Sequence, residues 1–295
     1  MRKLLLAGVL GLCASQASAA VLIYEPFNYT YNSPNGDPIQ GNTPAVPGTQ
    51  TWLQAGTANP PQQIRVASGN LAVPSPLASP VGNSAAITGG AVGNGAANRL
   101  GLGSTISADG SNVYFSFPLR IDALTGSNSV IGGFFIGLNN SIGTQTGNPS
   151  AVVARVQARI DPTDPTKYNL GIFRNIAATA GAPSWSGPLT VGDTHFIVAS
   201  VEIVTGAQND VARMWIDPSP SPSAPAATLT DSTTGTGTDF SIASIILRQT
   251  VAPYLTLDEL RVGTEWGDVA PIPEPASLAA LGLGGIALLG RRRRR

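Results

Sequence analysis

Apolar and polar residues alternate strictly along several stretches of this chain, and this pattern limits the folds that it can adopt. In VYFSFPLRI, residues 113–121, every second residue is apolar. AVVARVQARI, residues 151–160, has the same period and sets Arg155, Gln157 and Arg159 apart from the apolar positions. Alanine and arginine favour helices, but a period of two is the repeat of a strand. Both stretches are therefore predicted to be half-buried β-strands.

Other stretches rich in β-branched and aromatic residues indicate further strands. The predicted strands cover residues 130–138, 168–173, 195–204, 211–216, 239–248 and 254–262. Weaker strand signals lie at Trp52, 64–66 and 70–73. In the last stretch the apolar set shifts from Leu255 and Leu257 to Leu260 and Val262, which requires a β-bulge.

Proline and glycine mark the segments that we predict to be turns or loops. Residues 161–165 (DPTDP) and 217–226 (DPSPSPSAPA) contain several prolines, which lack the N–H group that a sheet needs. The glycine-rich segment 88–104 is also predicted to be a loop, and it lacks the Gly-Lys-Ser/Thr of a phosphate-binding loop. Pro118 indicates an edge strand or a bulge. Many antiparallel strands without helices predict an all-β body, either a sandwich or a barrel.

The first 19 residues have the features of a secretory signal peptide, which forms a signal helix. Basic residues at the start precede an apolar segment at 4–12. Ala17 and Ala19 supply the small residues of a cleavage site, so the mature chain is predicted to begin at Ala20.

An apolar run of 15 residues without a charge, 276–290, lies near the C-terminus. As a helix it would be about 22 Å long, somewhat shorter than the ~30 Å hydrocarbon core of a bilayer. Apolar side chains would cover all sides of this helix and leave no polar face, so we prefer a transmembrane helix to the alternative, a buried core helix. Arginines that follow a membrane segment stay on the cytoplasmic side and place the body outside. This membrane stop consists of Arg291, Arg292, Arg293, Arg294 and Arg295.

The chain thus divides into a signal peptide (1–19), one β-sandwich body (20–268) and a C-terminal segment (271–295). Residues 20–270 contain 10 basic and 16 acidic residues, a net charge of −6, which argues against a nucleic-acid partner. The only cysteine, Cys13, lies in the signal peptide, so the body has neither disulfides nor cysteine chemistry.

The body offers few side chains for catalysis. His195 is the only histidine and begins a predicted strand, which favours a surface role over a Ser-His-Asp triad. Asp258 and Glu259 are adjacent, so in a strand they would point to opposite faces, unlike a glycosidase pair. We therefore expect no enzyme activity, no catalytic residue and no zinc site. The carboxylates of Asp161 and Asp164 are candidate ligands for Ca²⁺ as a cofactor. A simpler explanation of the two residues is that Asp-Pro sequences form turns.

Tryptophan rings are the candidates for contact with a sugar. Trp185 lies in a polar Gly/Pro segment (APSWSGP) and is the best candidate for a glycan contact. Trp215 lies in the predicted strand 211–216, where packing explains it, and Trp266 follows the last strand.

Pro273, Glu274 and Pro275 directly precede the apolar run and the arginines. This order resembles the PEP-CTERM sorting signal of Gram-negative bacteria. The resemblance implies recognition by an exosortase, a membrane transpeptidase, and cleavage near the motif. It also implies an inner-membrane anchor during sorting, and then a place at the cell surface or outside the cell, where such proteins accompany exopolysaccharide and biofilm systems.

The body is similar to secreted concanavalin A-like, laminin-G-type jelly-roll domains. The similarity lies in YEPFNY, VYFSFPLRI, HFIVASVEIV with NDVARMWIDP, and LTLDELRVGTEW. In that fold the first and last strands lie side by side. We expect a non-enzymatic surface or matrix protein associated with extracellular polysaccharide. A lectin-like carbohydrate-binding module is the alternative, and a glycoside hydrolase ranks third.

Overall fold

The structure is a computed structural model. It describes residues 21–33, 36–44, 50–56, 64–88, 96–125, 132–174, 184–206, 209–234, 239–249 and 253–270. The predicted signal helix and transmembrane helix lie outside these stretches, as do the cleavage site, the sorting motif and the arginines of the membrane stop. Within them, no helix has the length and apolar character needed to cross a membrane.

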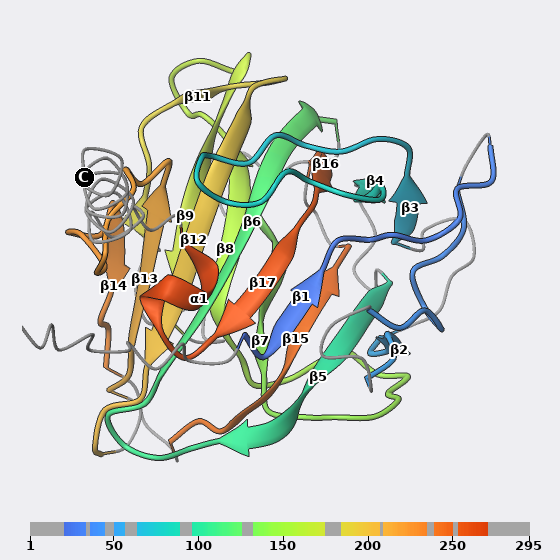
Figure 1. The fold of residues 1–295 in the computed structure, drawn as a ribbon. Helices are drawn as coiled ribbons and strands as arrows, with labels where there is room; N and C mark the ends of the chain where they lie inside the picture. The colour runs from blue at the N-terminus through green and yellow to red at the C-terminus, as the bar shows by residue number, and fades with distance from the viewer. Residues whose placement is uncertain are drawn as a thin grey trace, which may run out of the picture.

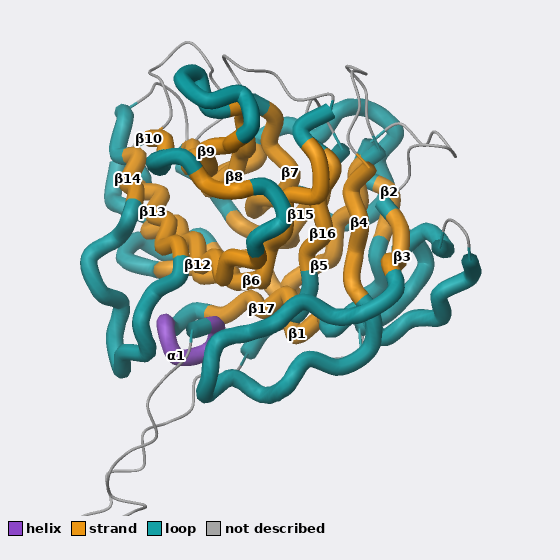
Figure 2. Tube along the Cα trace, turned by 90° about the horizontal axis from the view of Figure 1, so that it is seen from above, coloured by secondary structure: helices purple, strands orange, loops and turns teal. Residues whose placement is uncertain are grey.

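The described strands form two sheets that lie in layers (Figures 1 and 2). The nine-stranded sheet contains β1 (Ile23–Glu25), β3 (Arg65–Ala67), β4 (Ser84–Thr88), β6 (Asn112–Ala123), β12 (Thr194–Glu202), β13 (Val211–Ile216), β14 (Leu229–Asp231), β16 (Tyr254–Leu257) and β17 (Leu260–Gly263). Its order is β14-β13-β12-β6-β16-β4-β3, and β17 joins β6 to β1.

The eight-stranded sheet forms the second layer. It contains β2 (Leu53–Gln54), β5 (Ala97–Ile106), β7 (Gly133–Asn139), β8 (Val152–Ile160), β9 (Lys167–Phe173), β10 (Ser184–Trp185), β11 (Leu189–Thr190) and β15 (Ile242–Arg248). Its order is β10-β9-β8-β7-β15-β5-β2, with β11 also beside β9. One short helix, α1 (Trp266–Val269), follows the last strand.

All pairs between named strands in these sheets are antiparallel, so the predicted all-β antiparallel sandwich is confirmed. The first and last strands lie side by side, because Ile23 of β1 pairs with Val262 of β17. The two ends of the body are therefore neighbours in the same sheet.

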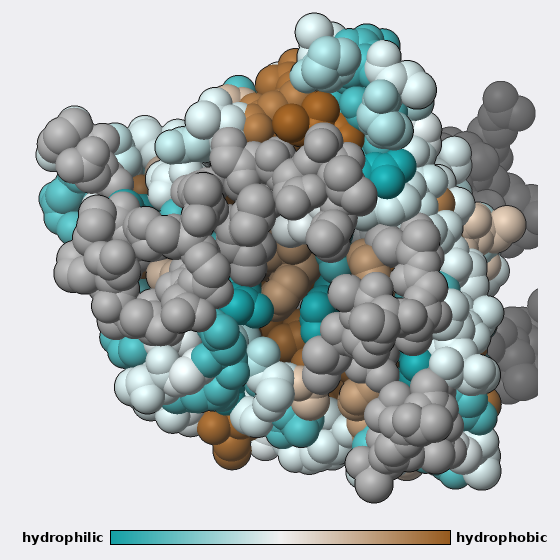
Figure 3. Space-filling view, turned by 180° about the vertical axis from the view of Figure 1, so that it is seen from behind, coloured by the Kyte–Doolittle hydropathy of each residue, from teal (hydrophilic) through white to brown (hydrophobic). Residues whose placement is uncertain are grey.

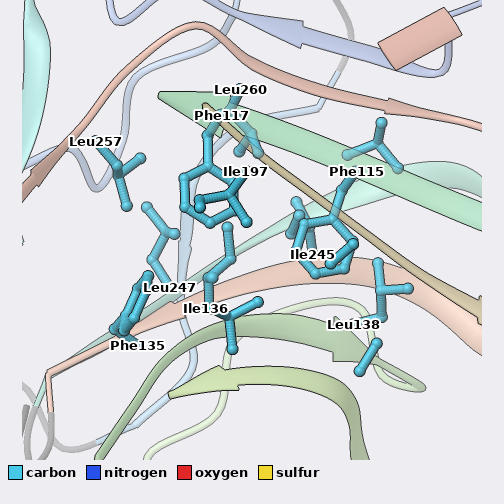
Figure 4. Packing of buried hydrophobic residues seen from close by; sticks show 14 of the residues in the cluster. Phe115, Phe117, Phe135, Ile136, Leu138, Ile197, Ile245, Leu247, Leu257 and Leu260 are labelled. Atoms are coloured by element: carbon cyan, nitrogen blue, oxygen red, sulfur yellow. The ribbon is translucent and has the colours of Figure 1, made fainter. Parts of the chain in front are cut away.

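The main core lies between the two sheets, where their apolar positions meet (Figure 4). Phe115 and Phe117 of β6 stack with ring centroids 6.2 Å apart, and Phe135 of β7 meets Phe117 edge-on. Each buried side chain of this size stabilises the fold by about 1.5–3 kcal/mol. The body contains no cysteine, so this core stabilises it without a disulfide.

Most of the predicted strands are present, within a few residues of the expected bounds. Residues 151–160 form a strand and not a helix, with Val153 and Val156 in the main core and Arg155 outside it. The segment 217–226 has no regular structure, as predicted. The stretch 70–73 is not a strand, which corrects the prediction. Instead, the Leu71 N–H donates a hydrogen bond to Asp258 (2.9 Å).

The prediction of a loop over 88–104 is also wrong, because β5 begins at Ala97. Leu100 and Leu102 enter the main core from alternate positions of β5. The intervening glycines hid this alternation, and Gln50 packs against the strand at one of them. A Cβ on Gly101 would lie 2.8 Å from the Gln50 Oε1.

The bulge predicted for the last strand is confirmed. Asp258 and Glu259 separate β16 from β17, and Glu259 has a positive φ of 45°. The interruption lies opposite Pro118, whose carbonyl accepts the Asp258 N–H (3.2 Å) and which has no N–H to offer. Because β6 lies inside the sheet, Pro118 marks a bulge in its neighbour and not an edge.

Candidate functional site

The eight-stranded sheet has one face that points away from the main core and carries arginine and aromatic side chains. A separate apolar cluster lies there and includes Phe134, Val152 and Ile246. We call this surface the arginine face and define it by Arg99 (β5), Phe134 (β7), Arg155 and Arg159 (β8), Trp185 (β10) and Arg248 (β15). On the side of the molecule opposite the view of Figure 1, hydrophilic and hydrophobic residues adjoin in a central hollow (Figure 3).

Trp185, the predicted glycan contact, is half-buried at the β10 end of this face. It pairs with Gly171 of β9, where a Cβ would lie 2.7 Å from the indole ring. The missing side chain therefore lets the ring lie close to the sheet. The guanidinium of Arg159 lies 4.3 Å from a ring centroid, a cation–π distance. Trp185 thus holds Arg159 in place at the surface.

Arg155 and Arg248 come from different strands and share one aromatic ring. Their guanidinium carbons lie 4.8 Å and 4.9 Å from the centroid of Phe134. Burial, together with the nearby charge of Arg248, lowers the pKa of Arg155 to about 10. Burial also lowers the pKa of Arg248. The ring brings two like charges together in a half-buried setting.

Arg99 lies deepest on the arginine face, with 1 % of its surface exposed. Its Nη2 donates to the Gln145 side chain (2.6 Å), whereas its Nε has no hydrogen-bond partner among the described residues. The Arg248 Nη2 donates to the Asn148 side chain (3.1 Å), and within the same part of the chain the Arg248 Nε has no partner. Neutral amides therefore bind these guanidiniums, and no described carboxylate forms an ion pair with either.

Three carboxylates near the closing strands are buried for structural reasons. Glu25 accepts hydrogen bonds from the Phe27 N–H (2.7 Å), the Trp52 indole (2.6 Å) and the Tyr29 hydroxyl. Because of its burial, the pKa of Glu25 is raised. The other two carboxylates, Asp258 and Glu259, belong to the bulge between β16 and β17.

Asp258 and Glu259 bind different segments of the chain. Asp258 accepts the N–H groups of Leu71 and of Glu259 itself, and burial raises its pKa to about 7. Glu259 accepts the N–H of Val81 (2.9 Å) and the hydroxyl of Tyr24 (2.7 Å). Both side chains are fully buried and engaged, so the pair fixes the main chain.

His195 begins β12 at the surface, as predicted. Its Nδ1 lies 2.6 Å from the Asp217 carboxylate, and its Nε2 has no hydrogen-bond partner among the described residues. The hydrogen bond with Asp217 raises the pKa of His195 against the opposing effect of burial. The histidine and the aspartate thus form an ion pair when His195 is protonated.

Asp161 and Asp164 form a turn, in agreement with the simpler explanation of the DPTDP segment. One oxygen of Asp161 accepts the N–H groups of Thr163 and Asp164, each at 2.9 Å. Asp164 accepts the N–H of Thr166 (3.0 Å) in the same manner. In the part of the chain that the structure describes, no three His, Cys, Asp or Glu residues are grouped as metal ligands.

The other tryptophans pack inside the fold. Trp52 is fully buried against Phe27. Trp215 and Trp266 meet edge-on, with ring centroids 5.1 Å apart. Their indole N–H groups donate to the carbonyls of Pro225 and Ser221, which fastens the proline-rich loop over them.

The arginine face is the feature that the sequence did not reveal. The sequence alone predicts one strand face that carries Arg155, Gln157 and Arg159. It places Arg99 in a predicted loop and Arg248 at the end of another predicted strand. Only the order β8-β7-β15-β5 brings these side chains to one surface.

The comparisons with known proteins match two separate parts of the chain. The model of the PEP-CTERM protein-sorting motif matches residues 271–295. No curated protein matches the sequence.

Solved structures match the body with low identity. A variant alginate lyase, solved with an alginate tetrasaccharide, is 13% identical over 65% of this chain and 82% of its own, with a TM-score of 0.41. Peanut lectin is 10% identical over 72% and 96%, with a TM-score of 0.35. A carbohydrate esterase from a Shiga toxin-encoding bacteriophage is 10% identical over 84% and 99%, with a TM-score of 0.40. These scores carry no inference about function, and the fold rests on the strand pairing.

The described residues form an antiparallel two-sheet sandwich whose first and last strands pair. Residues 271–295, which follow this body directly, are a PEP-CTERM protein-sorting motif, the signal of an exported protein that is sorted to the surface by an exosortase.

Proposed function

We propose that this chain is a non-enzymatic component of the extracellular matrix, delivered through a temporary C-terminal anchor. The sorting motif at residues 271–295 carries this proposal. The apolar run 276–290 holds the body at the inner membrane with the arginines in the cytoplasm. Exosortase cleavage near Pro273–Pro275 then frees the sandwich for the cell surface or the surrounding exopolysaccharide of a Gram-negative bacterium.

The placement of the carboxylates supports a non-enzymatic body. Glycoside hydrolysis by a retaining mechanism needs two carboxylates about 5 Å apart that face a sugar. Asp258 and Glu259 are fully buried and accept main-chain N–H groups. Their hydrogen bonds anchor residues 71 and 81 to the closing strands, which is a structural role.

Sorting is tested in cells by following the body with an antibody raised against it. We expect the wild-type protein in the surface or medium fraction of a host that contains the exosortase, and in the membrane fraction of a host without it. Replacing Pro273, Glu274 and Pro275 by alanine should retain the body in the membrane in both hosts. Ser277→Ala, which leaves Pro273, Glu274 and Pro275 unchanged, serves as the control. Equal distributions of the wild type and the triple variant would contradict the proposal.

A lectin-like carbohydrate-binding module is the second candidate function, and the half-buried Trp185 favours it. The indole is accessible beside Arg159, at the end of a sheet face rather than inside the core. Binding of the protein to the producing organism's exopolysaccharide, measured with Ca²⁺ and with EDTA, tests this candidate. Loss of binding in Trp185→Ala supports it, and unchanged binding removes Trp185 from the site.

A further inference from the structure

We propose that the arginine face is a binding site for an acidic polysaccharide, one that carries carboxylate or sulfate groups along its chain. Arg155 and Arg248 are its anion-binding groups, and Arg99 adds a buried positive charge beneath the face. Phe134 is the platform for the guanidiniums of Arg155 and Arg248, and Trp185 is the platform for that of Arg159. This inference rests on the proposed function, because export brings the body into contact with extracellular polysaccharide.

The distribution of charge between the sheets is the first argument. The body has a net charge of −6, yet no Asp or Glu occurs in any described strand of the eight-stranded sheet. The same strands contain Lys167 and four of the body's ten basic residues as arginines. The nine-stranded sheet mixes both signs, for example Arg213 with Glu202 (2.7 Å). An acidic protein thus has one sheet that is purely basic.

The uncompensated charges are the second argument. A buried or half-buried charge is costly unless an opposite charge or sufficient hydrogen bonds accompany it. Arg155 and Arg248 lie over the same ring, and no ion pair of either is present among the described residues. The Nε atoms of Arg99 and Arg248 are buried, and no described residue supplies an acceptor for them. Local conflicts of this kind occur at functional sites, where a ligand resolves them.

The shape of the face indicates the ligand class. Guanidinium groups bind carboxylates and sulfates through two parallel hydrogen bonds. The arginines extend over the strand order β8-β7-β15-β5, and Trp185 adds β10 beyond β9. At about 4.8 Å per strand, β10 to β5 span roughly 24 Å, which suits several units of a linear chain.

A nucleic acid fits this face less well than a polysaccharide. Single-stranded nucleic acids bind by stacking bases on exposed aromatic rings. Phe134 is only 7 % exposed and is covered by two guanidiniums. Arg155 and Arg248 cover the ring that a base would need to stack on, whereas carboxylate or sulfate groups of a sugar chain bind the guanidiniums themselves.

Binding of the full-length protein in detergent tests the proposal, with polygalacturonate, dextran sulfate, uncharged dextran and double-stranded DNA as probes. Arg155→Gln/Arg248→Gln removes two charges from the arginine face. Arg120→Gln/Arg213→Gln removes two from the other sheet, where both arginines are paired with carboxylates, and is the charge-matched control. We expect salt-sensitive binding of polygalacturonate or dextran sulfate, reduced about tenfold or more in the first variant and less than about twofold in the control.

The two acidic probes separate carboxylate from sulfate recognition, and either result supports the site. Thermal unfolding without ligand checks that the variant is still folded. The melting temperature of Arg155→Gln/Arg248→Gln should not fall, because the substitutions remove two like charges that lie close together. Equal losses in both variants, equal binding of uncharged dextran, preference for DNA, or no binding of either acidic probe would overturn the proposal. Purified protein is used, so these outcomes are independent of whether sorting itself occurs.

Discussion

At the scale of single residues, the carboxylates of this protein serve mainly to fix the main chain. Asp217 accepts the Phe196 N–H (2.7 Å), and Asp231 accepts the Arg174 N–H (2.8 Å). Asp210 accepts the Val204 N–H (2.9 Å) near the start of the β12–β13 connection. These bonds hold strand ends and turns in place, and they account for acidic residues that could otherwise be mistaken for catalytic groups.

The ion pair of His195 and Asp217 predicts a pH dependence of stability. The hydrogen bond with Asp217 raises the pKa of His195 above its ordinary value of 6.5. The stabilisation is therefore fully present below about pH 6.5 and is lost as the pH rises through the higher folded-state pKa. Because the pair is partly exposed, we expect a loss of about 0.5–1 kcal/mol. Urea unfolding at pH 5.5 and 8.5 should show a loss of stability in Asp217→Asn that is smaller than the wild-type loss by about this amount; identical losses would argue against the pair.

Asp258 predicts a second, larger pH effect. Burial raises its pKa to about 7, whereas in the unfolded chain it titrates near its ordinary value of 3.8. Its contribution to stability is therefore highest in acid and falls as the pH rises through about 7. Between pH 5 and pH 8 the titration of Asp258 should contribute a loss of about 2–3 kcal/mol in the wild type. Asp258→Asn keeps an acceptor oxygen but cannot ionise, so its unfolding free energy should change less over this range. An unchanged slope would show that Asp258 does not titrate there.

At the scale of elements, the closing strand fixes both ends of the body through Glu259. This side chain binds Tyr24 of β1, the main chain at Val81 and Arg261 of β17 (3.1 Å). The positive φ of Glu259 turns its side chain toward these partners, whereas in a regular strand the side chain would point away from them. The bulge thus joins the first strand, the last strand and the loop before β4.

Removing this side chain should destabilise the body strongly. Glu259→Ala leaves the nearly buried Arg261 without its carboxylate, so we expect a loss of about 3–5 kcal/mol in the free energy of unfolding. Glu202→Ala removes a half-exposed partner of Arg213 and should cost less than about 1 kcal/mol. Chemical denaturation of both variants measures the difference. Similar, small losses in the two variants would show that Glu259 is not a structural anchor.

Strands with regular alternation could be predicted from the sequence, because their pattern reports burial directly. β6, β12 and β13 belong to this class, and the phase shift in the last strand located the bulge. In β8 the predicted alternation is broken at Ala154, which has a positive φ of 46°, so that Val153 lies in the main core and Val152 in the outer apolar cluster. β5 could not be predicted, since glycines at alternate positions carry no signal of burial. Its position between β15 and β2 supplies the strand conformation.

The candidate site was far less predictable than the strands. The alternation of Arg155 and Arg159 was visible, and Trp185 stood out by its polar surroundings. Their relation to Arg248 and Phe134 depends on which strands are neighbours, and this information is non-local. The sorting motif is the opposite case, because it is a linear signal that the sequence contains in full.

At the scale of the whole molecule, the chain combines a self-contained sandwich with a separate sorting segment. The described main core and the pairing of β1 with β17 both lie within residues 21–270. Cleavage near Pro273–Pro275 would therefore leave these described contacts within one fragment.

Mass spectrometry of the protein recovered from the cell surface or medium tests this account most directly. Trypsin cuts after Arg261 and after Arg291, with no Lys or Arg between them, so an unprocessed chain yields the peptide 262–291. We predict that this peptide is absent and that a shorter one, beginning at Val262 and ending near Pro273–Pro275, replaces it. Recovery of peptides that span Pro275 to Arg291 from the released protein would contradict cleavage at the sorting motif.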